Sequence, residues 1–173
     1  MEKGRFIVFM MKEKVYPNRS AEITESISKQ YKRICYVCLS STYDDVISWM
    51  TSAKIDSKKF YFVDTLSSYY GQRPNQENCF FASSPSDLGE IKQAISSAIK
   101  EKGCKIVIFD SISSLLEYKD LFSILKFTHV LMTEKGYSDA KKLFLVVSEE
   151  MPEEENKRLV TDLKMFADSV VSV

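Results

Sequence analysis

The stretch Lys105-Ile106-Val107-Ile108-Phe109-Asp110-Ser111 decides the fold, because it places four apolar residues directly before an acid and a hydroxyl. An unbroken apolar run with polar ends indicates a strand that is buried on both faces, as in a parallel sheet. Asp110 then lies at the carboxyl end of that strand, the edge of an open α/β sheet where ligands bind. A carboxylate there can hold Mg²⁺ beside a phosphate, or it can cap the following turn.

Similar apolar runs alternate with helical periodicity along the chain. We expect strands at 5–11, 33–39, 60–64, 79–82, 105–110, 142–147 and 168–173, and helices at 20–31, 42–53, 84–102, 119–134 and 159–166. Ser84 is the expected N-cap of the third helix, with Pro85 in its first position. Residues 12–17, 65–78 and 148–156 are expected loops. This alternation predicts a three-layer α/β fold, with helices on both faces of a mostly parallel sheet.

Length and charge limit the classes of protein to consider. The 173 residues are expected to form a single domain, 1–173, with a sizeable core. Lys plus Arg and Asp plus Glu both number 24, so the net charge is zero and bulk charge gives no strong nucleic-acid signal. No apolar run reaches the length of a membrane span and no signal peptide is evident. We therefore expect a cytoplasmic protein that does not enter membranes.

The cysteines and the histidine do not predict a metal centre. Cys35 and Cys38 form a C-x-x-C pattern, but they lie inside an expected strand, where side chains three apart point to opposite faces. His129 is the only histidine, and no second Cys pair completes a zinc site. We expect buried structural thiols, a packing or surface role for His129, and no metal site.

Four segments together resemble the KaiC-like ATPase domains of the RecA superfamily. The Asp-Ser-Ile-Ser-Ser-Leu-Leu run at 110–116 is similar to their Walker B region, and the strands at 34–39 and 59–65 are similar to the strands that precede it. The Ala-Asp-Ser-Val-Val run at 167–171 is similar to their final strand. The resemblance covers most of the chain in the right order, and it implies a RecA-like fold of the P-loop NTPase type.

The same resemblance exposes two departures from an active ATPase. A P-loop reads G-x-x-x-x-G-K-[ST] between the first strand and the first helix, whereas residues 13–20 read EKVYPNRS. Arg19 and Ser20 stand in the Lys and Ser/Thr places, but both glycines are absent and Pro17 removes an N–H donor. The catalytic Glu expected after the second strand is replaced by Ser40 and Ser41.

A chain that lacks both the phosphate cradle and the catalytic base should not hydrolyse ATP. We therefore predict a catalytically inactive pseudo-ATPase without a cofactor, acting as a regulatory or protein-interaction module through self-association or an active RecA/KaiC-like paralogue. The loops at 65–78 and 148–155 are the candidate surfaces. Alternatively, the chain is a regulator that binds Mg·ATP through Arg19, Ser20, Asp110 and Ser111, with Asp110 on the Mg²⁺, and hydrolyses little or none of it. The motifs of other α/β enzymes, such as a nucleophile elbow or a dinucleotide-binding glycine turn, are absent.

Overall fold

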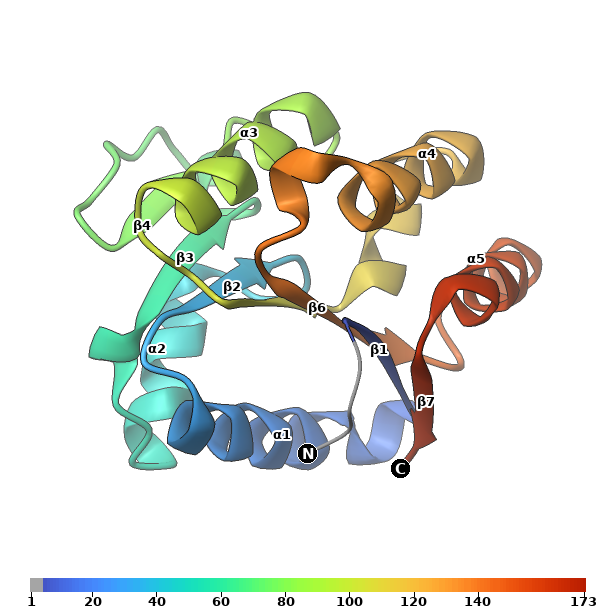
Figure 1. Cartoon of the computed structure of the whole chain (residues 1–173), viewed down its shortest axis with the longest axis horizontal. Coiled ribbons are helices and arrows are strands. Elements are labelled where there is room, and N and C mark those ends of the chain that lie inside the picture. Colours follow the sequence, from blue (N-terminus) through green and yellow to red (C-terminus); the bar gives the residue numbers. More distant parts are fainter. Residues whose placement is uncertain (1–4) are drawn as a thin grey trace.

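The computed structural model describes residues 5–173, and its centre is a seven-stranded sheet (Figure 1). The strand order is β4-β3-β2-β5-β6-β1-β7, and every neighbouring pair is parallel. The strands are β1 (Phe6–Met11), β2 (Ile34–Cys38), β3 (Phe60–Asp64), β4 (Cys79–Phe81), β5 (Ile106–Asp110), β6 (Lys141–Val147) and β7 (Ser169–Ser172). The parallel sheet predicted from the apolar runs is confirmed.

Helices cover both faces of this sheet and complete three layers (Figure 1). One face packs against α1 (Tyr16–Gln30) and α2 (Tyr43–Ser52), and the other against α3 (Leu88–Lys100), α4 (Leu121–Thr133) and α5 (Glu153–Phe166). The side chains of β2 show how the strands supply both layers, because Val37 packs toward α3 while Tyr36 packs toward α1 and α2. The two apolar faces explain the continuous apolar runs of the sequence.

The sheet has a topological switch point between β2 and β5. The chain leaves β2 through α2 toward β3, and it leaves the neighbouring β5 through α4 toward β6 on the opposite side. Cys38 at the end of β2 is in register with both Asp64 of β3 and Asp110 of β5. Connections that diverge in this way open a crevice beyond the carboxyl ends of the strands. Asp110 therefore stands at the position where this fold class binds its ligands.

Three predicted helix starts are wrong, each for a local reason. Helix α1 begins at Tyr16 rather than at residue 20, because Pro17 is accepted in the first turn, where its missing N–H costs nothing. Helix α3 begins at Leu88, since the carboxylate of Asp87, not Ser84, caps the helix by accepting the Glu90 N–H at 2.9 Å. Helix α5 begins six residues earlier than predicted.

The early start of α5 absorbs much of the expected acidic loop. Glu153, Glu154 and Glu155 occupy its first turn, where carboxylates interact favourably with the helix dipole. Among the described residues, 5–173, no helix is long and apolar enough to cross a membrane.

The cysteines and the histidine occupy the structural positions that were expected. Cys35 and Cys38 are buried on opposite faces of the sheet, and all four thiols are free. Burial raises the pKa of both thiols well above the ordinary range. His129 lies partly exposed on α4, with Nε2 at 2.7 Å from Asp162 of α5. The buried thiols thus belong to the two apolar clusters, and His129 links α4 to α5.

Candidate functional site at the carboxyl edge

Asp110 ends β5 in a buried position and has few hydrogen-bond donors. Its side chain is 5% exposed, and one carboxylate oxygen accepts a hydrogen bond from the Tyr36 hydroxyl of β2. The Ser40 hydroxyl lies 3.5 Å from the other oxygen, a long contact. Burial raises the pKa of Asp110 to about 7. The carboxyl group is therefore partly protonated at neutral pH, and it bonds to the neighbouring strand rather than capping the turn that follows β5.

The connection from β1 to α1, where a P-loop would lie, is closed by its own hydrogen bonds. It contains a 3-10 turn at Glu13–Val15, after which α1 starts at once. The Glu13 N–H donates to Oε2 of Glu149 at 2.7 Å, and the Val15 and Tyr16 N–H groups both donate to the Lys12 carbonyl at 3.1 Å. Pro17 has no N–H to offer. These backbone donors are therefore already engaged within the chain.

A pocket of about 490 Å³ opens between α1 and α2 and reaches Asp110. Ser20 also lines it, although the Ser20 hydroxyl donates to the Pro17 carbonyl at 3.2 Å. The hydroxyl of Tyr16, another lining residue, is buried and has no hydrogen-bond partner among residues 5–173. The structure thus brings Ser20 and Asp110 to one cavity, with an unsatisfied phenol beside them.

The other two candidate ligand residues lie outside this pocket. Arg19 is not among the lining residues, and its guanidinium pairs with Glu22 at 2.7 Å on the surface of α1. Ser111 is fully buried, and its hydroxyl lies 2.7 Å from that of Ser113. The four residues named for nucleotide binding therefore do not converge on one point in this structure.

A second hollow, of about 520 Å³, lies over the ends of β2 and β3 and is walled by tyrosines. Tyr69 and Tyr118 stand with ring centroids 5.9 Å apart, and Tyr70 beside them is 88% exposed. Ser40 and Ser41 form part of the floor. Tyr69 and Tyr70 belong to the loop at 65–78, which the sequence predicted as a candidate surface. Tyr118 was not predicted, because it follows the buried turn after β5 and becomes their neighbour only through the fold.

The loop that carries Tyr69 and Tyr70 contacts α2 through Arg73. Arg73 pairs with Asp44 of α2 at 2.8 Å, and its guanidinium carbon lies 4.3 Å from the ring centroid of Phe81. A 3-10 turn at Ser67–Tyr69 shapes the start of the loop. The segment therefore presents its aromatic side chains from a defined backbone.

No metal centre accompanies these features in the part of the chain that the structure describes. Among residues 5–173, no group of three or more His, Cys, Asp or Glu side chains is placed to hold a metal ion. Asp110 is a lone carboxylate in its pocket, and nearby hydroxyls supply the remaining polar groups.

No family model and no curated protein matches this sequence, but solved structures do. The uncharacterized protein PH0321 from Pyrococcus horikoshii, crystallised with an unknown peptide, has a TM-score of 0.73 at 15% identity over 99% of this chain and 78% of its own. The KaiC-like protein PH0186 from the same organism has a TM-score of 0.68 at 16% identity over 98% and 72%. The flagellar accessory protein FlaH from Methanocaldococcus jannaschii has 0.60 at 14% identity over 98% and 70%. The chain therefore has a KaiC-like fold of the RecA type, as the sequence resemblance implied.

Proposed function

We propose that this chain is a pseudo-ATPase, a RecA-type domain that works through protein contacts rather than phosphoryl transfer. The observation that carries the proposal is the closed β1–α1 connection. A P-loop binds phosphates by directing free backbone N–H groups at them. Here the Glu13, Val15 and Tyr16 N–H groups are hydrogen-bonded within the chain. The Glu149 carboxylate, which accepts the Glu13 N–H, would also repel a polyphosphate at this connection.

The residues at the switch point support the same conclusion. Phosphoryl transfer requires charge stabilisation and a positioned nucleophile. Asp110 is bonded to Tyr36 and has a pKa raised to about 7, so at neutral pH it is a weaker Mg²⁺ ligand than an ionised carboxylate. Ser40, in the place of the catalytic Glu, donates to the Asp110 carbonyl at 3.2 Å. A serine without an adjacent base cannot activate water.

The tyrosine-walled hollow is the surface that we propose for protein contacts. Tyrosine gives large contact area together with a hydroxyl, and it is enriched where proteins bind one another. Tyr70 is almost fully exposed, while Tyr69 and Tyr118 form the wall beside it. An extended peptide segment of a partner suits a hollow of this size. The crystal structure of PH0321, which contains an unknown peptide, supports the choice of a peptide as the occupant.

Peptide selection tests this proposal. A displayed peptide library would be selected on the wild-type chain, and the recovered peptides measured against Tyr69→Ala/Tyr70→Ala. The matched control is Phe122→Ala, which removes an exposed aromatic ring of α4 that does not line the hollow. We expect binding to be lost in the double variant and kept in the control. Peptides that bind Tyr69→Ala/Tyr70→Ala as tightly as Phe122→Ala would contradict the proposal. So would phosphate release from Mg·ATP that disappears in Asp110→Asn.

One observation favours a second candidate, a regulator that binds a nucleotide without hydrolysing it. The pocket between α1 and α2 joins Asp110, Ser20 and the unpartnered Tyr16 hydroxyl, and a buried polar atom without a partner is unusual in a native fold. A ligand that accepted a hydrogen bond from Tyr16 would satisfy it. Equilibrium binding of Mg·ATP to the wild type and to Tyr16→Phe separates the candidates, because only a ligand in this pocket loses affinity in that variant.

A further inference from the structure

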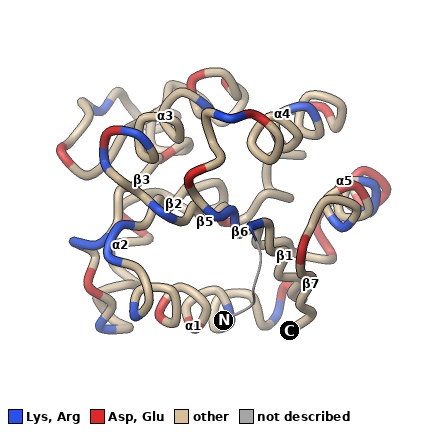
Figure 2. The backbone as a smooth tube through the Cα atoms, in the orientation of Figure 1, with Lys and Arg blue, Asp and Glu red and all other residues tan. Residues whose placement is uncertain are grey.

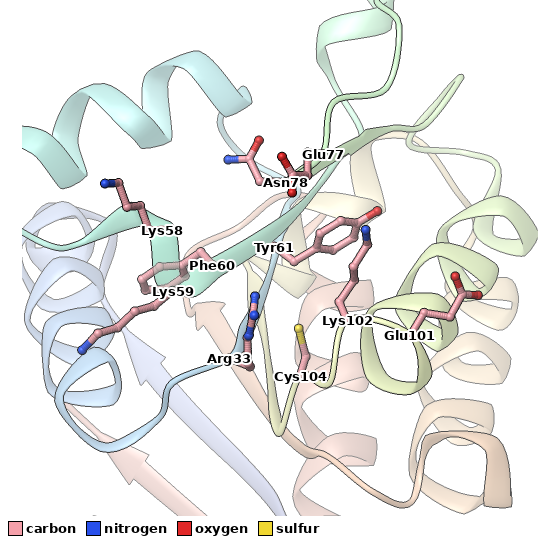
Figure 3. A pocket seen from close by; sticks show the side chains of 10 residues that line it. All are labelled: Arg33, Lys58, Lys59, Phe60, Tyr61, Glu77, Asn78, Glu101, Lys102 and Cys104. Carbon is pink, nitrogen blue, oxygen red and sulfur yellow. The ribbon is translucent and has the colours of Figure 1, made fainter.

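The opposite edge of the sheet, where the strands begin, carries a pocket remote from Asp110 (Figure 3). It has a volume of about 510 Å³ and lies where β2, β3, β4 and β5 start and α3 ends. Arg33, Lys58, Lys102 and Tyr61 are among its lining residues. Pockets of this volume are typical of small-molecule sites, and this one is lined by Phe60 and Tyr61 of β3 and by the turns that lead into the neighbouring strands.

Basic side chains are in excess in this pocket, and among residues 5–173 none of the four has an anionic partner, although Lys59 donates to the Ser28 carbonyl at 2.7 Å. Four lining residues are Lys or Arg and two are Glu. Within residues 5–173, no carboxylate lies within 4.0 Å of the Arg33, Lys58 or Lys102 cations. Figure 3 shows Arg33 in the middle of the pocket and the Glu101 carboxylate turned away from it. The pocket therefore offers several cations to an incoming anion.

The strand register places further positive charge on either side of Arg33. Ile34 pairs with Phe60 of β3 and Ile106 of β5, so Arg33, one residue earlier, lies between Lys59 and Lys105. The Lys105 N–H donates to the Arg33 carbonyl at 3.1 Å, which confirms this alignment. Lys59 points away from Arg33 in Figure 3, and its ammonium group donates to the Ser28 carbonyl at 2.7 Å. An anion bound here would therefore gain from the nearby cations that have no carboxylate partner.

This arrangement is part of a charge separation that the zero net charge conceals. Figure 2 shows Lys and Arg gathered where β2, β5 and β6 begin. The carboxyl edge instead holds acids, including Asp64 and Glu149. The field at the amino edge therefore attracts anions, although the whole chain is neutral.

Tyr61 supplies a wall for this pocket and helps to position Lys102. The ammonium nitrogen of Lys102 lies 5.4 Å from the centroid of the Tyr61 ring, within the range of a cation–π contact. Burial raises the pKa of the Tyr61 phenol, so its hydroxyl remains a neutral hydrogen-bond donor. A ligand thus meets a fixed ring beside the unpaired cations.

We propose that this amino-edge pocket binds a small phosphorylated ligand, with its phosphate group contacting Arg33 and Lys102. Several unpaired cations favour a ligand with more than one negative charge, and the guanidinium fork matches the geometry of phosphate oxygens. Glu77 and Glu101 bound the pocket and would repel a long polyanion, which favours a compact ligand over a nucleic acid strand. The proposal is independent of what occupies the carboxyl edge.

Titration calorimetry with pyrophosphate and tripolyphosphate, in metal-free buffer of low ionic strength, tests this inference. We expect tripolyphosphate to bind, and Arg33→Ala or Lys102→Ala to weaken it by about tenfold or more, because each change removes a charge-assisted contact. Lys164→Ala is the matched control, since it removes the same charge from the exposed end of α5. It should change the affinity less than twofold. Arg33→Lys should retain part of the binding.

Three results would overturn the inference. The first is that neither pyrophosphate nor tripolyphosphate binds at about 10 mM, well above the concentrations at which specific sites fill. The second is an equal loss in Arg33→Ala, Lys102→Ala and Lys164→Ala, which would mean non-specific charge attraction. The third is tighter binding of a single-stranded oligonucleotide than of tripolyphosphate. Because Arg33 and Lys102 are exposed, the variants should remain folded, which circular dichroism would check.

Discussion

Asp64 and Asp110 end the two strands that flank β2, and both are buried, yet their surroundings differ. Asp64 accepts N–H hydrogen bonds from Tyr43 at 2.6 Å and from Leu66 and Ser67 at 2.8 Å, and a hydroxyl hydrogen bond from Ser67 at 2.5 Å. Asp110 has the Tyr36 hydroxyl and one long contact. Asp64 is thus a carboxylate that joins the loop after β3 to the start of α2, whereas Asp110 faces a pocket with its bonding capacity partly unused. A strand-end acid can therefore serve structure or remain available to a ligand, depending on the donors around it.

The largest expected effect comes from Asp64→Asn. The amide keeps the shape of the side chain but places an NH₂ group against donors that need an acceptor. We expect the free energy of unfolding to fall by about 3 kcal/mol, since several buried donors lose a charged partner at once. Urea unfolding measures this change. A loss below about 1 kcal/mol would remove the distinction between the two aspartates.

Asp110→Asn should instead increase the free energy of unfolding at alkaline pH. Because burial raises the pKa of Asp110 to about 7, from an ordinary value of 3.8, the folded chain keeps this proton between about pH 4 and pH 7 while the unfolded chain has lost it. The Asp110 contribution to stability therefore falls as the pH rises through that window. Removing the carboxylate should stabilise the fold at pH 8 by roughly 2 kcal/mol.

The pH dependence of that difference is the sharper measurement. Urea unfolding at a series of pH values gives the difference in the free energy of unfolding between Asp110→Asn and the wild type. This difference should shrink steadily from pH 8 to pH 5. A gap that does not vary with pH would show that Asp110 is ionised in the fold at all these values, as a fully satisfied carboxylate would be.

Tyr36→Phe should have a smaller effect, because it removes a single hydroxyl. The Tyr36 hydroxyl donates to Asp110, and its loss should cost about 1 kcal/mol at pH 8, where the carboxylate needs a donor most. The cost should diminish at pH 5, when Asp110 is protonated. Phe62→Leu, a change in the same apolar cluster that removes no hydrogen-bonding group, is the control whose cost should not vary with pH.

Asp44→Asn should have the smallest effect of this series. Asp44 pairs with Arg73 at 2.8 Å, but its side chain is 69% exposed. Exposed ion pairs contribute little, so we expect a change below about 0.5 kcal/mol by urea unfolding. This variant is also the matched control for Asp64→Asn, because both replace an aspartate near the start of α2. If Asp44→Asn and Asp64→Asn lowered the free energy of unfolding equally, burial would not decide the role of these acids.

The sequence predicted the positions of Asp64 and Asp110 but not the difference between them. Apolar runs that end in an acid indicate a strand end, and the parallel sheet follows from their alternation with helices. The donors to Asp64 come from residues near in sequence as well as from the start of α2, and only the folded loops bring them together. A local sequence pattern does not predict how many hydrogen-bond donors tertiary contacts will bring to a side chain.

Helix starts and the amino-edge pocket mark two other limits of sequence reasoning. Pro17 was taken as part of a loop, although proline suits the first helical turn equally well, so residue type alone left the α1 boundary open. The pocket around Arg33 had a visible signal, because Arg33, Lys59 and Lys105 each directly precede a strand. That signal has meaning only once the strand order places the three residues side by side.

Thermal melting of the Arg33→Ala variant with millimolar Mg·ATP tests the central claim most directly, since the variant removes phosphate binding at the amino edge. ATP held at the carboxyl edge at 100 times its dissociation constant would stabilise the fold by about 2.7 kcal/mol, a rise of a few degrees in melting temperature. The closed β1–α1 connection predicts no rise with ATP, ADP or sulfate. A rise specific to Mg·ATP that disappears in Arg33→Ala/Asp110→Ala would contradict the claim and show that Asp110 still serves a nucleotide site.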